Sequence, residues 1–317
     1  MKIILITPAA KLAKNGNRTT AIRWARILRE LGHQVRIDVE WDGRPADMMV
    51  AIHAWRSAQS ALQFRECYPK RPLIVLLAGT DIYRFQKSHP EETYKCMEVA
   101  DGLACLHEQV HRSIPAEFAS KLHVVHQSAP PLTMPRKPSI RHFDICVVGH
   151  LREEKDPLRT ALAVRNMPPG SKIRAIHLGK AHSADWADKA KKEMARNPRY
   201  HWLGEVPGWR VRREFAKTQL MVLSSIAEGG ANVISEAVAA GVPIVASDID
   251  GVIGLLGESY DGYYPVEDTH ALRALLVRAE VDPTFLRRLE QQCAAKHSLF
   301  TLERERAEWR VLLDAVL

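Results

Sequence analysis

Two carboxylates, Glu228 and Glu236, stand eight residues apart in the stretch SSIAEGGANVISEAVAAGVPIVAS (224–247), and Gly229 and Gly230 follow directly on the first of them. Glycines let the backbone approach a ligand closely, and the free N–H groups at the start of a helix favour an anion such as phosphate. Carboxylates are poor neighbours for phosphate, but they accept hydrogen bonds from sugar hydroxyls. The combination favours a ligand that carries both groups, a nucleotide sugar. A solvated glutamate beside an ordinary helix start is the plain alternative.

The neighbouring residues predict the elements that hold these groups. The run LMVLSS (220–225) is apolar enough for a buried parallel strand. Apolar positions from Val233 to Ala240 then fit a helix, which Gly241 ends, and PIVAS follows as the next strand. This order places Glu228 in the turn and Glu236 about one turn into the helix, so that both can reach one pocket.

The composition is that of a globular protein with about two domains: 317 residues, of which 46% are apolar and 26% charged. No run approaches the roughly 18 apolar residues of a membrane span, and the start of the chain lacks a signal-peptide pattern, so no membrane partner is expected. Five widely spaced cysteines without a CxxC fit a reduced cytoplasm. The net charge of +8 is spread along the chain, which favours anionic substrates over nucleic acid.

Strand-like runs alternate with helical patterns in two series, and a proline-rich segment (128–142) separates them as a linker. We therefore expect an α/β protein with two Rossmann-like domains and mostly parallel sheets, at residues 1–137 and 138–300. A helix at 301–317, with Trp309 and Leu312 on its apolar face, would pack back toward the first domain. The first helix, at about residues 19–31, is expected to bury Ile22, Ala25 and Leu28.

The first series carries polar side chains directly after its strands, where parallel sheets bind ligands. His53 and Arg56 follow MMVAI, and Thr80, Asp81 and Arg84 follow LIVLLAG. Asp81 is open to three interpretations: a general base, a hydrogen-bond acceptor or a helix N-cap. For His53, an ordinary surface histidine is the alternative.

Other candidates lie in the loop after the first strand and at the end of the first series. Gly16 lies between Asn15 and Asn17, and either a ligand-binding loop or a simple flexible turn fits it. Arg18 would point toward an anionic second substrate. The residues after LHVV are candidates for contacts with sugar or phosphate: Gln127 and Ser128.

In the second series, Arg152 and Lys155 follow the strand DICVVG. They are placed to stabilise the negative charge on a departing nucleotide without a metal, although a solvated helix start is the alternative. Two metal patterns are declined. HEQVH (107–111) matches HExxH but follows a strand without a third ligand, and DID (248–250) fits a simple turn. No metal or other cofactor is expected.

Together these motifs resemble the family-4-type glycosyltransferases of the GT-B architecture, in which two Rossmann-like domains face each other across a cleft. KNGNRTTAIRWARILRELGHQV, VVGHLREEKDPLRTALAV, HWLGEVP and the E-x7-E stretch carry the resemblance over nearly all of the chain. One position departs from the pattern, because His150 stands where the family usually has Arg.

The resemblance implies a role for each candidate. Glu236 would accept the ribose hydroxyls and Glu228 would face the donor sugar. The catalytic groups would be Glu228, Asp81 and His53. The donor-binding groups would be Gly16, Arg152, Lys155, Gly229, Gly230, Ala231, Asn232 and Glu236, and the acceptor-binding groups would be Asn17, Arg18, Arg56, Thr80, Arg84, Gln127 and Ser128.

A narrower resemblance rests on NGNRTTAIRW, HAWRSAQSA, GTDIYR, HQSAPP and GHLREEKDP. These stretches look like the SenB-type selenosugar synthases of selenoneine biosynthesis. That resemblance implies transfer of a sugar from UDP-glucose or UDP-N-acetylglucosamine to selenophosphate, with formation of a carbon–selenium bond. The alternatives are a UDP-sugar-dependent glycosyltransferase with an alcohol acceptor, such as a lipid or glycan, and a non-catalytic nucleotide or nucleic-acid binder.

Overall fold

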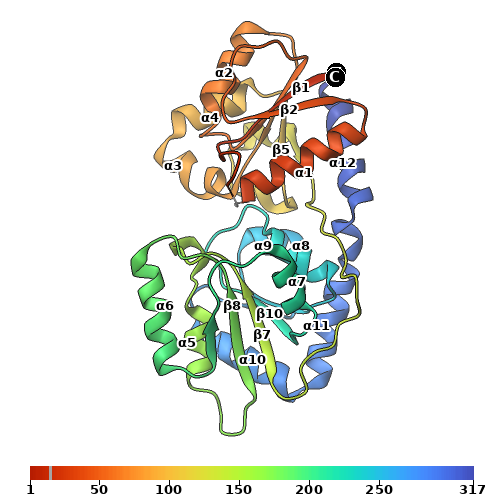
Figure 1. The fold of residues 1–317 in the computed structure, drawn as a ribbon. Coiled ribbons are helices and arrows are strands. Elements are labelled where there is room, and N and C mark those ends of the chain that lie inside the picture. Colours follow the sequence, from red (N-terminus) through yellow and green to blue (C-terminus); the bar gives the residue numbers. More distant parts are fainter. Residues whose placement is uncertain (14–15) are drawn as a thin grey trace. The chain divides into compact units, whose positions relative to one another are not determined.

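A computed structural model describes residues 1–13 and 16–317 and confirms an α/β fold with two parallel sheets of six strands each. The chain forms two compact units (Figure 1). Unit 1 contains Met1–Gln127 and Leu302–Leu317, and unit 2 contains Ser128–Thr301. None of the helices in the described residues is both long enough and apolar enough to cross a bilayer.

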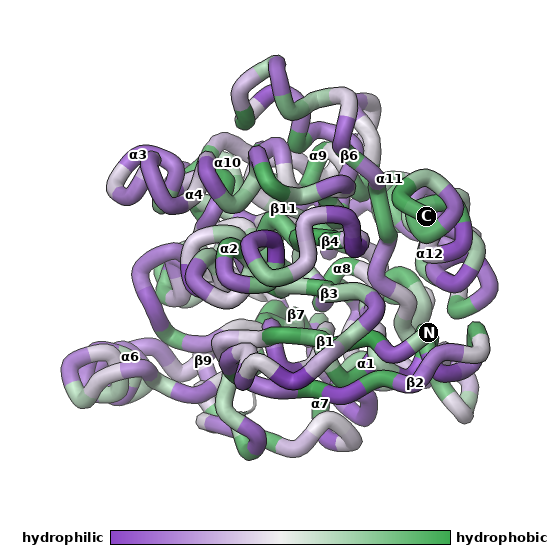
Figure 2. The backbone as a smooth tube through the Cα atoms, turned by 90° about the horizontal axis from the view of Figure 1, so that it is seen from above, coloured by the Kyte–Doolittle hydropathy of each residue, from purple (hydrophilic) through white to green (hydrophobic). Residues whose placement is uncertain are grey.

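The sheet of unit 1 has the strand order β2-β1-β3-β4-β5-β6, and all of its neighbouring pairs are parallel. Its core strands are short apolar runs, and Figure 2 colours much of β1 and β3 as hydrophobic. Residues 3–6 of β1 and all residues of β3 are buried. The order reverses between β1 and β3, and parallel sheets bind ligands at the carboxyl ends of the strands beside such a reversal. The strands are β1 (Lys2–Ile6), β2 (Gln34–Asp38), β3 (Met48–Ile52), β4 (Leu73–Leu76), β5 (Gly102–Cys105) and β6 (Leu122–Val124).

The helices of unit 1 include one irregular element at the end of β4, a π-helix at Asp81–Phe85 (η1). Such turns occur often at functional sites. The α-helices are α1 (Gly16–Glu30), α2 (Ala58–Cys67), α3 (Gln86–Ser88), α4 (Pro90–Val99) and α12 (Leu302–Val316), and the short 3₁₀ helices are η2 (Glu108–Arg112) and η3 (Ala116–Lys121).

Helix α12 belongs to the core of unit 1, although it follows unit 2 in the chain. Figure 1 draws it in blue beside the red α1, and the Trp24 and Trp309 rings meet edge-on with centroids 4.8 Å apart. The buried Glu305 carboxylate accepts hydrogen bonds from Trp24 Nε1 at 3.0 Å and Arg23 Nε at 2.9 Å. Aromatic packing and a buried ion pair therefore attach this helix to α1.

The sheet of unit 2 has the order β12-β11-β10-β7-β8-β9 and reverses between β7 and β10. Its strands are β7 (Phe143–Val148), β8 (Ile173–Leu178), β9 (Tyr200–Trp202), β10 (Leu220–Leu223), β11 (Ile244–Ser247) and β12 (Tyr263–Tyr264). Its helices are α5 (Arg159–Arg165), α6 (Ala184–Arg196), α7 (Gly208–Phe215), α8 (Asn232–Ala239), α9 (Asp250–Leu256), α10 (Thr269–Val281) and α11 (Pro283–Ala295), with the 3₁₀ helices η4 (Glu153–Lys155) and η5 (His297–Phe300).

The proline-rich segment 128–142 is irregular and packs on unit 2. Lys137 N donates to Ala216 O at 2.8 Å and Arg136 Nη2 donates to Thr218 O at 2.8 Å. The compact unit therefore begins at Ser128, ten residues before the position expected from the sequence. The segment has few apolar side chains, and apolar side chains are the sequence signal from which packing is predicted. Its hydrogen bonds to backbone carbonyl groups of unit 2 leave no such signal.

One expectation for α1 was wrong. Ile22 is 53% exposed, whereas the buried face contains Ala21, Trp24 and Leu28. The packing of α12 on Trp24 turns this face inward, and a helical pattern read from α1 alone carries no information about a partner almost 300 residues away.

Candidate active site

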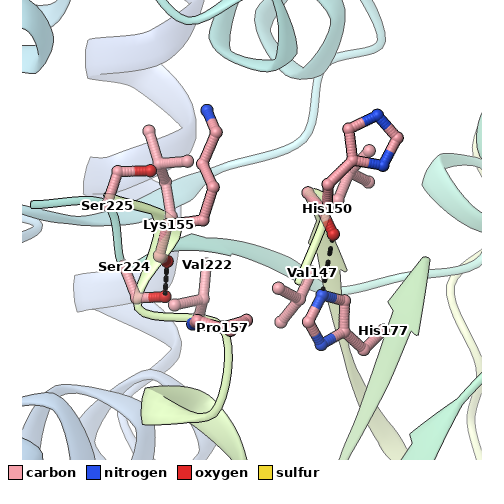
Figure 3. A pocket seen from close by; sticks show the side chains of 11 residues that line it. Val147, His150, Lys155, Pro157, His177, Val222, Ser224 and Ser225 are labelled. Carbon is pink, nitrogen blue, oxygen red and sulfur yellow. Dashed lines mark hydrogen bonds between the residues drawn. The ribbon is translucent and has the colours of Figure 1, made fainter. Parts of the chain in front are cut away.

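The carboxyl ends of β7 and β10 meet at the reversal of the sheet in unit 2 and form a small pocket. Figure 3 shows Lys155, Ser224 and Ser225 on one side of this pocket and His150 and His177 on the other. The Lys155 ammonium and the His150 ring both extend toward the same side, at the top of the figure. The structure thus brings together a cation, hydroxyls and an imidazole where a parallel sheet binds ligands.

Glu228 lies beside this pocket and is 9% exposed. Its Oε1 atom accepts a hydrogen bond from Ser225 Oγ at 2.6 Å and pairs with the Lys155 ammonium. A Cβ atom at Gly251 would lie 1.8 Å from the carbonyl oxygen of Glu228, so only glycine fits at that position of α9. A cation and a hydroxyl therefore hold the carboxylate, and the close approach of Gly251 restricts the backbone of Glu228.

The remaining residues of the E-x7-E stretch lie as the sequence predicts. Gly229 and Gly230 precede α8, Gly230 has a φ of +126°, and Asn232 is the first helical residue. Ala231 holds the N-cap position. Glu236 lies on the exposed face of α8, so the two carboxylates differ sharply in environment.

The cations near the β7 loop differ in exposure. Arg152 is 38% exposed and lies 3.8 Å from Glu154, whereas Lys155 is 19% exposed and neutralised by Glu228. Burial lowers the pKa of the His150 imidazole, and the neighbouring His182, Arg152 and Lys155 lower it further. His150 is therefore mostly uncharged at neutral pH and offers the site an N–H group rather than a charge.

His177 at the end of β8 fixes the β7 loop from below. Its Nε2–H donates to the carbonyl oxygen of Gly149 at 3.0 Å, and its Nδ1 accepts from the Tyr200 hydroxyl at 2.9 Å (Figure 3 draws the first bond). Burial lowers the pKa of His177 to about 4, so the ring stays neutral.

In unit 1, three of the candidates form one hydrogen-bonded chain. His53 Nδ1 lies 2.6 Å from Asp81 Oδ1, and His53 Nε2 lies 3.0 Å from Thr80 Oγ1. His53 Nδ1 also accepts the backbone N–H of Arg56 at 3.2 Å, so Nε2 is the nitrogen that can donate, toward Thr80 Oγ1. His53 has a φ of +81°, which is uncommon for a residue other than glycine, and these two partners hold it there.

Asp81 also accepts three backbone N–H groups, from Ala54 at 2.8 Å, Trp55 at 3.0 Å and Ala78 at 2.9 Å. Of the three interpretations that the sequence left open, the geometry favours the hydrogen-bond acceptor, because both oxygens are already occupied. Asp81 ties the turn after β3 to the turn after β4.

Two guanidinium groups surround the ring of Phe85 at the end of the π-helix. The Cζ atoms of Arg56 and Arg84 lie 5.7 Å and 5.6 Å from its centroid, and both side chains are exposed. Trp55 stacks on the same ring with centroids 4.1 Å apart, and His89 packs against Trp55 at 4.3 Å. The result is a positively charged aromatic surface beside the His53 chain.

The remaining candidates lie at the start of α1 and after β6. Gly16 begins α1, Asn17 and Arg18 lie in its first turn, and Asn15 falls outside the described residues. Gln127 is 4% exposed and donates from Nε2 to Thr20 Oγ1 at 2.8 Å. The last of them, Ser128, is the first residue of unit 2.

Sequence reasoning missed His182, His177, Ser225, Trp55 and Phe85. Each of these residues lies at or just after the end of a strand or turn that was predicted from the sequence. This position in the chain was the signal that could have identified them as site residues. Among residues 1–13 and 16–317, no three His, Cys, Asp or Glu side chains are grouped as a metal site. His107 of the HEQVH stretch accepts a hydrogen bond from Gln109 N at 3.2 Å as an N-cap.

Comparison with solved structures gives the same fold over nearly the whole chain. A sucrose-phosphate synthase from Thermosynechococcus elongatus superimposes with a TM-score of 0.81 at 14% identity, covering 99% of this chain and 98% of that one. HepE from Anabaena, in complex with UDP and glucose, superimposes with a TM-score of 0.79 at 15% identity, covering 99% and 100%. These similarities confirm the GT-B fold.

Sequence comparison adds the family. TuaC of Bacillus subtilis (strain 168), whose name assigns it to teichuronic acid biosynthesis, is 28% identical over 133 residues. The match covers 42% of this chain and only 32% of TuaC, so the chain matches about a third of the length of this curated relative. The family model described as "Glycosyl transferases group 1" matches residues 136–295, half of the chain, and this match includes the pocket, Glu228 and Glu236. The chain therefore belongs to the group 1 glycosyltransferases.

Proposed function

We propose that this glycosyltransferase transfers a sugar from UDP-glucose or UDP-N-acetylglucosamine to selenophosphate. A selenium lone pair would form the bond to the anomeric carbon. The bond between that carbon and the diphosphate oxygen would break, and its electron pair would leave with UDP. The donor half of the proposal is supported by HepE, which was solved with UDP, with UDP and glucose, and with UDP-glucose.

One observation carries the acceptor half. At the carboxyl ends of β3 and β4, the groups that might act as a base are occupied, whereas cations are exposed. Asp81 accepts from three backbone N–H groups and its Oδ1 lies 2.6 Å from His53 Nδ1, which accepts the N–H of Arg56, while the second nitrogen of His53 contacts Thr80. An alcohol acceptor needs a base to remove its proton, whereas an anionic selenium nucleophile needs only positioning and charge neutralisation.

The residues of unit 2 would take the donor roles that the resemblance implies. Arg152, Lys155 and the backbone N–H groups from Gly229 to Asn232 would neutralise the diphosphate as negative charge develops on it. Glu228 would accept hydrogen bonds from the sugar hydroxyls, and Glu236 would accept them from the ribose. Because no metal is expected, these fixed groups carry the stabilisation, and a chelator should leave the rate unchanged.

In unit 1, Arg56 and Arg84 would bind the acceptor anion, with Thr80 as a hydroxyl donor. His53 and Asp81 would then position Thr80 rather than transfer a proton. Arg18 and Asn17 in the first turn of α1, together with Gln127 and Ser128, remain candidates for the same anion.

A glycan acceptor is the second candidate, and two observations favour it. TuaC is named for the biosynthesis of a polysaccharide. Trp55 and His89, both half-buried, also offer aromatic rings to a ligand, and Trp55 stacks on the buried Phe85 behind it.

Mass spectrometry separates the two candidates. The purified protein is incubated with each UDP-sugar, with and without freshly made selenophosphate. A selenosugar that appears together with UDP only when both substrates are present supports the proposal. Transfer to added glycans, with no selenium product, would refute the selenium acceptor and retain the donor site.

Variants test the acceptor site directly. We expect Arg56→Gln and Arg84→Gln each to raise the KM for selenophosphate about tenfold, as loss of one charge-assisted hydrogen bond predicts, without changing UDP binding. Lys70→Gln, at an exposed cation of the same unit, is the matched control. Equal effects of all three substitutions would contradict an acceptor role for the two arginines.

A further inference from the structure

His150 and His182 form a pair of rings at the carboxyl ends of β7 and β8, and His182 has no role in the function proposed above. Their centroids are 5.3 Å apart. Backbone hydrogen bonds hold the two loops together, from Leu151 N to Lys180 O at 2.9 Å and from His182 N to Leu151 O at 3.0 Å. These bonds continue the parallel pairing of β7 and β8 beyond the ends of the two strands. This continued pairing sets the distance between the two rings.

The two histidines differ in their capacity to take up a proton. His150 Nδ1 accepts the backbone N–H of Lys180 at 3.1 Å, so a proton on that nitrogen would break the bond. His150 is thereby held as the neutral tautomer with a proton on Nε2. His182 lies at the exposed side of the pair, where its ring is accessible to solvent and ligand.

The surroundings of the pair are mostly positive. His182 faces His150, Arg152 and Lys180, with Glu154 as the opposing carboxylate, and His150 also faces Lys155 and Glu205. Burial lowers the pKa of His182, and Arg152 lowers it further, so that His182 is mostly uncharged at neutral pH when no ligand is bound. A diphosphate would reverse this, because an anion stabilises the charged imidazolium.

We propose that His182 takes up a proton when the diphosphate of a nucleotide sugar binds beside His150, so that donor binding is coupled to protonation. His150, whose Nδ1 accepts from Lys180, supplies an Nε2–H donor, and the protonated His182 beside it supplies a positive charge. Loss of that proton then favours release of the nucleotide. The proposal depends on the donor half of the proposed function and is independent of selenium.

Isothermal titration calorimetry with UDP-glucose tests this coupling. The diphosphate of UDP-glucose is esterified at both ends, so the ligand itself does not titrate near neutrality, unlike UDP with its terminal phosphate. Titrations at pH 7 in two buffers with different ionisation enthalpies give the number of protons taken up. We expect about one half to one proton, and about tenfold weaker binding at pH 8.5 than at pH 6.5.

Two variants assign the proton. His182→Gln should abolish the uptake and flatten the pH dependence, and His182→Arg should abolish the uptake while keeping tight binding at pH 8.5. His270→Gln, at an exposed histidine of α10, is the matched control and should behave as the original protein.

Each contrary result overturns the proposal in a different way. Uptake that persists in His182→Gln would mean that another group binds the proton, and heats independent of buffer would mean that no proton binds. A protein that binds neither UDP-glucose nor UDP-N-acetylglucosamine at any pH would refute the donor half of the proposed function as well, whereas a missing selenosugar would leave the coupling intact.

Discussion

Glu228 and Glu236 should affect donor binding and turnover in opposite ways, and Glu228→Gln is the sharpest test. In the structure, the Glu228 carboxylate neutralises the Lys155 ammonium and accepts a hydrogen bond from Ser225. The amide keeps the size of the side chain and removes its charge. Lys155 then becomes available to the diphosphate, while the sugar loses its ionised acceptor.

The magnitude follows from the strength of charge-assisted hydrogen bonds, about 1.5–3 kcal/mol each. Loss of one such bond to the sugar in the transition state should lower kcat by about 10- to 100-fold. The affinity for UDP should stay constant or rise by up to about tenfold. In the variant the Lys155 ammonium is no longer attracted by a charged Glu228, so it can interact more strongly with the diphosphate.

The assay combines UDP titration by calorimetry with kcat at saturating UDP-sugar. Glu236→Gln is the comparison, because this carboxylate lies exposed on α8 and should chiefly weaken UDP binding, by about tenfold. If Glu228→Gln weakened UDP binding tenfold and left kcat unchanged, the assignment of the two glutamates would be reversed. Negligible effects of both would remove the E-x7-E stretch from the site altogether.

Three further results are expected. Burial would lower the pKa of His126, but its hydrogen bonds to Glu108 and Glu308 outweigh burial and raise it to about 9, so this imidazolium should stabilise the fold fully below pH 6.5 and lose that contribution as the pH rises to 9. The urea midpoint should fall over this range, and it should fall less in His126→Gln. Trp309→Ala should destabilise the protein by about 3–5 kcal/mol in urea unfolding, whereas Val311→Ala, at a position 63% exposed, should change little. Gly251→Ala should lower both turnover and melting temperature, because its Cβ atom would overlap a carbonyl oxygen at 1.8 Å, whereas Gly208→Ala has nothing within 4 Å and should be tolerated.

The helices and strands that could be predicted are those whose residue pattern depends on the segment itself and not on a distant partner in the chain. Strands of a parallel sheet are largely apolar runs, so the positions of β1 to β11, eleven strands, could be predicted within one or two residues, but β12 consists only of Tyr263–Tyr264 and offers no run to detect. The buried face of α1 depends on α12, and no pattern within either helix encodes that pairing.

The residues of the candidate site also fall into those that could be predicted from the sequence and those that could not. Polar residues that directly follow strands, such as His53 and Lys155, could be found by position alone. The chain from Asp81 through His53 to Thr80 could not, because it joins two turns that are 27 residues apart. His182 escaped notice because its importance comes from His150, in the loop after the adjacent strand β7, and from the charge of the surrounding loops.

The placement of α12 in unit 1 has a consequence for the order of folding during synthesis. Unit 2 is complete in sequence at Thr301, whereas the core of unit 1 requires Trp309 and Leu312. We infer that unit 2 reaches its folded state on the ribosome first, and that unit 1 waits with part of its apolar core exposed until α12 emerges. In arrested nascent chains, resistance to protease should therefore develop over residues 128–301 before it develops over residues 1–127. Simultaneous protection of both would contradict this order.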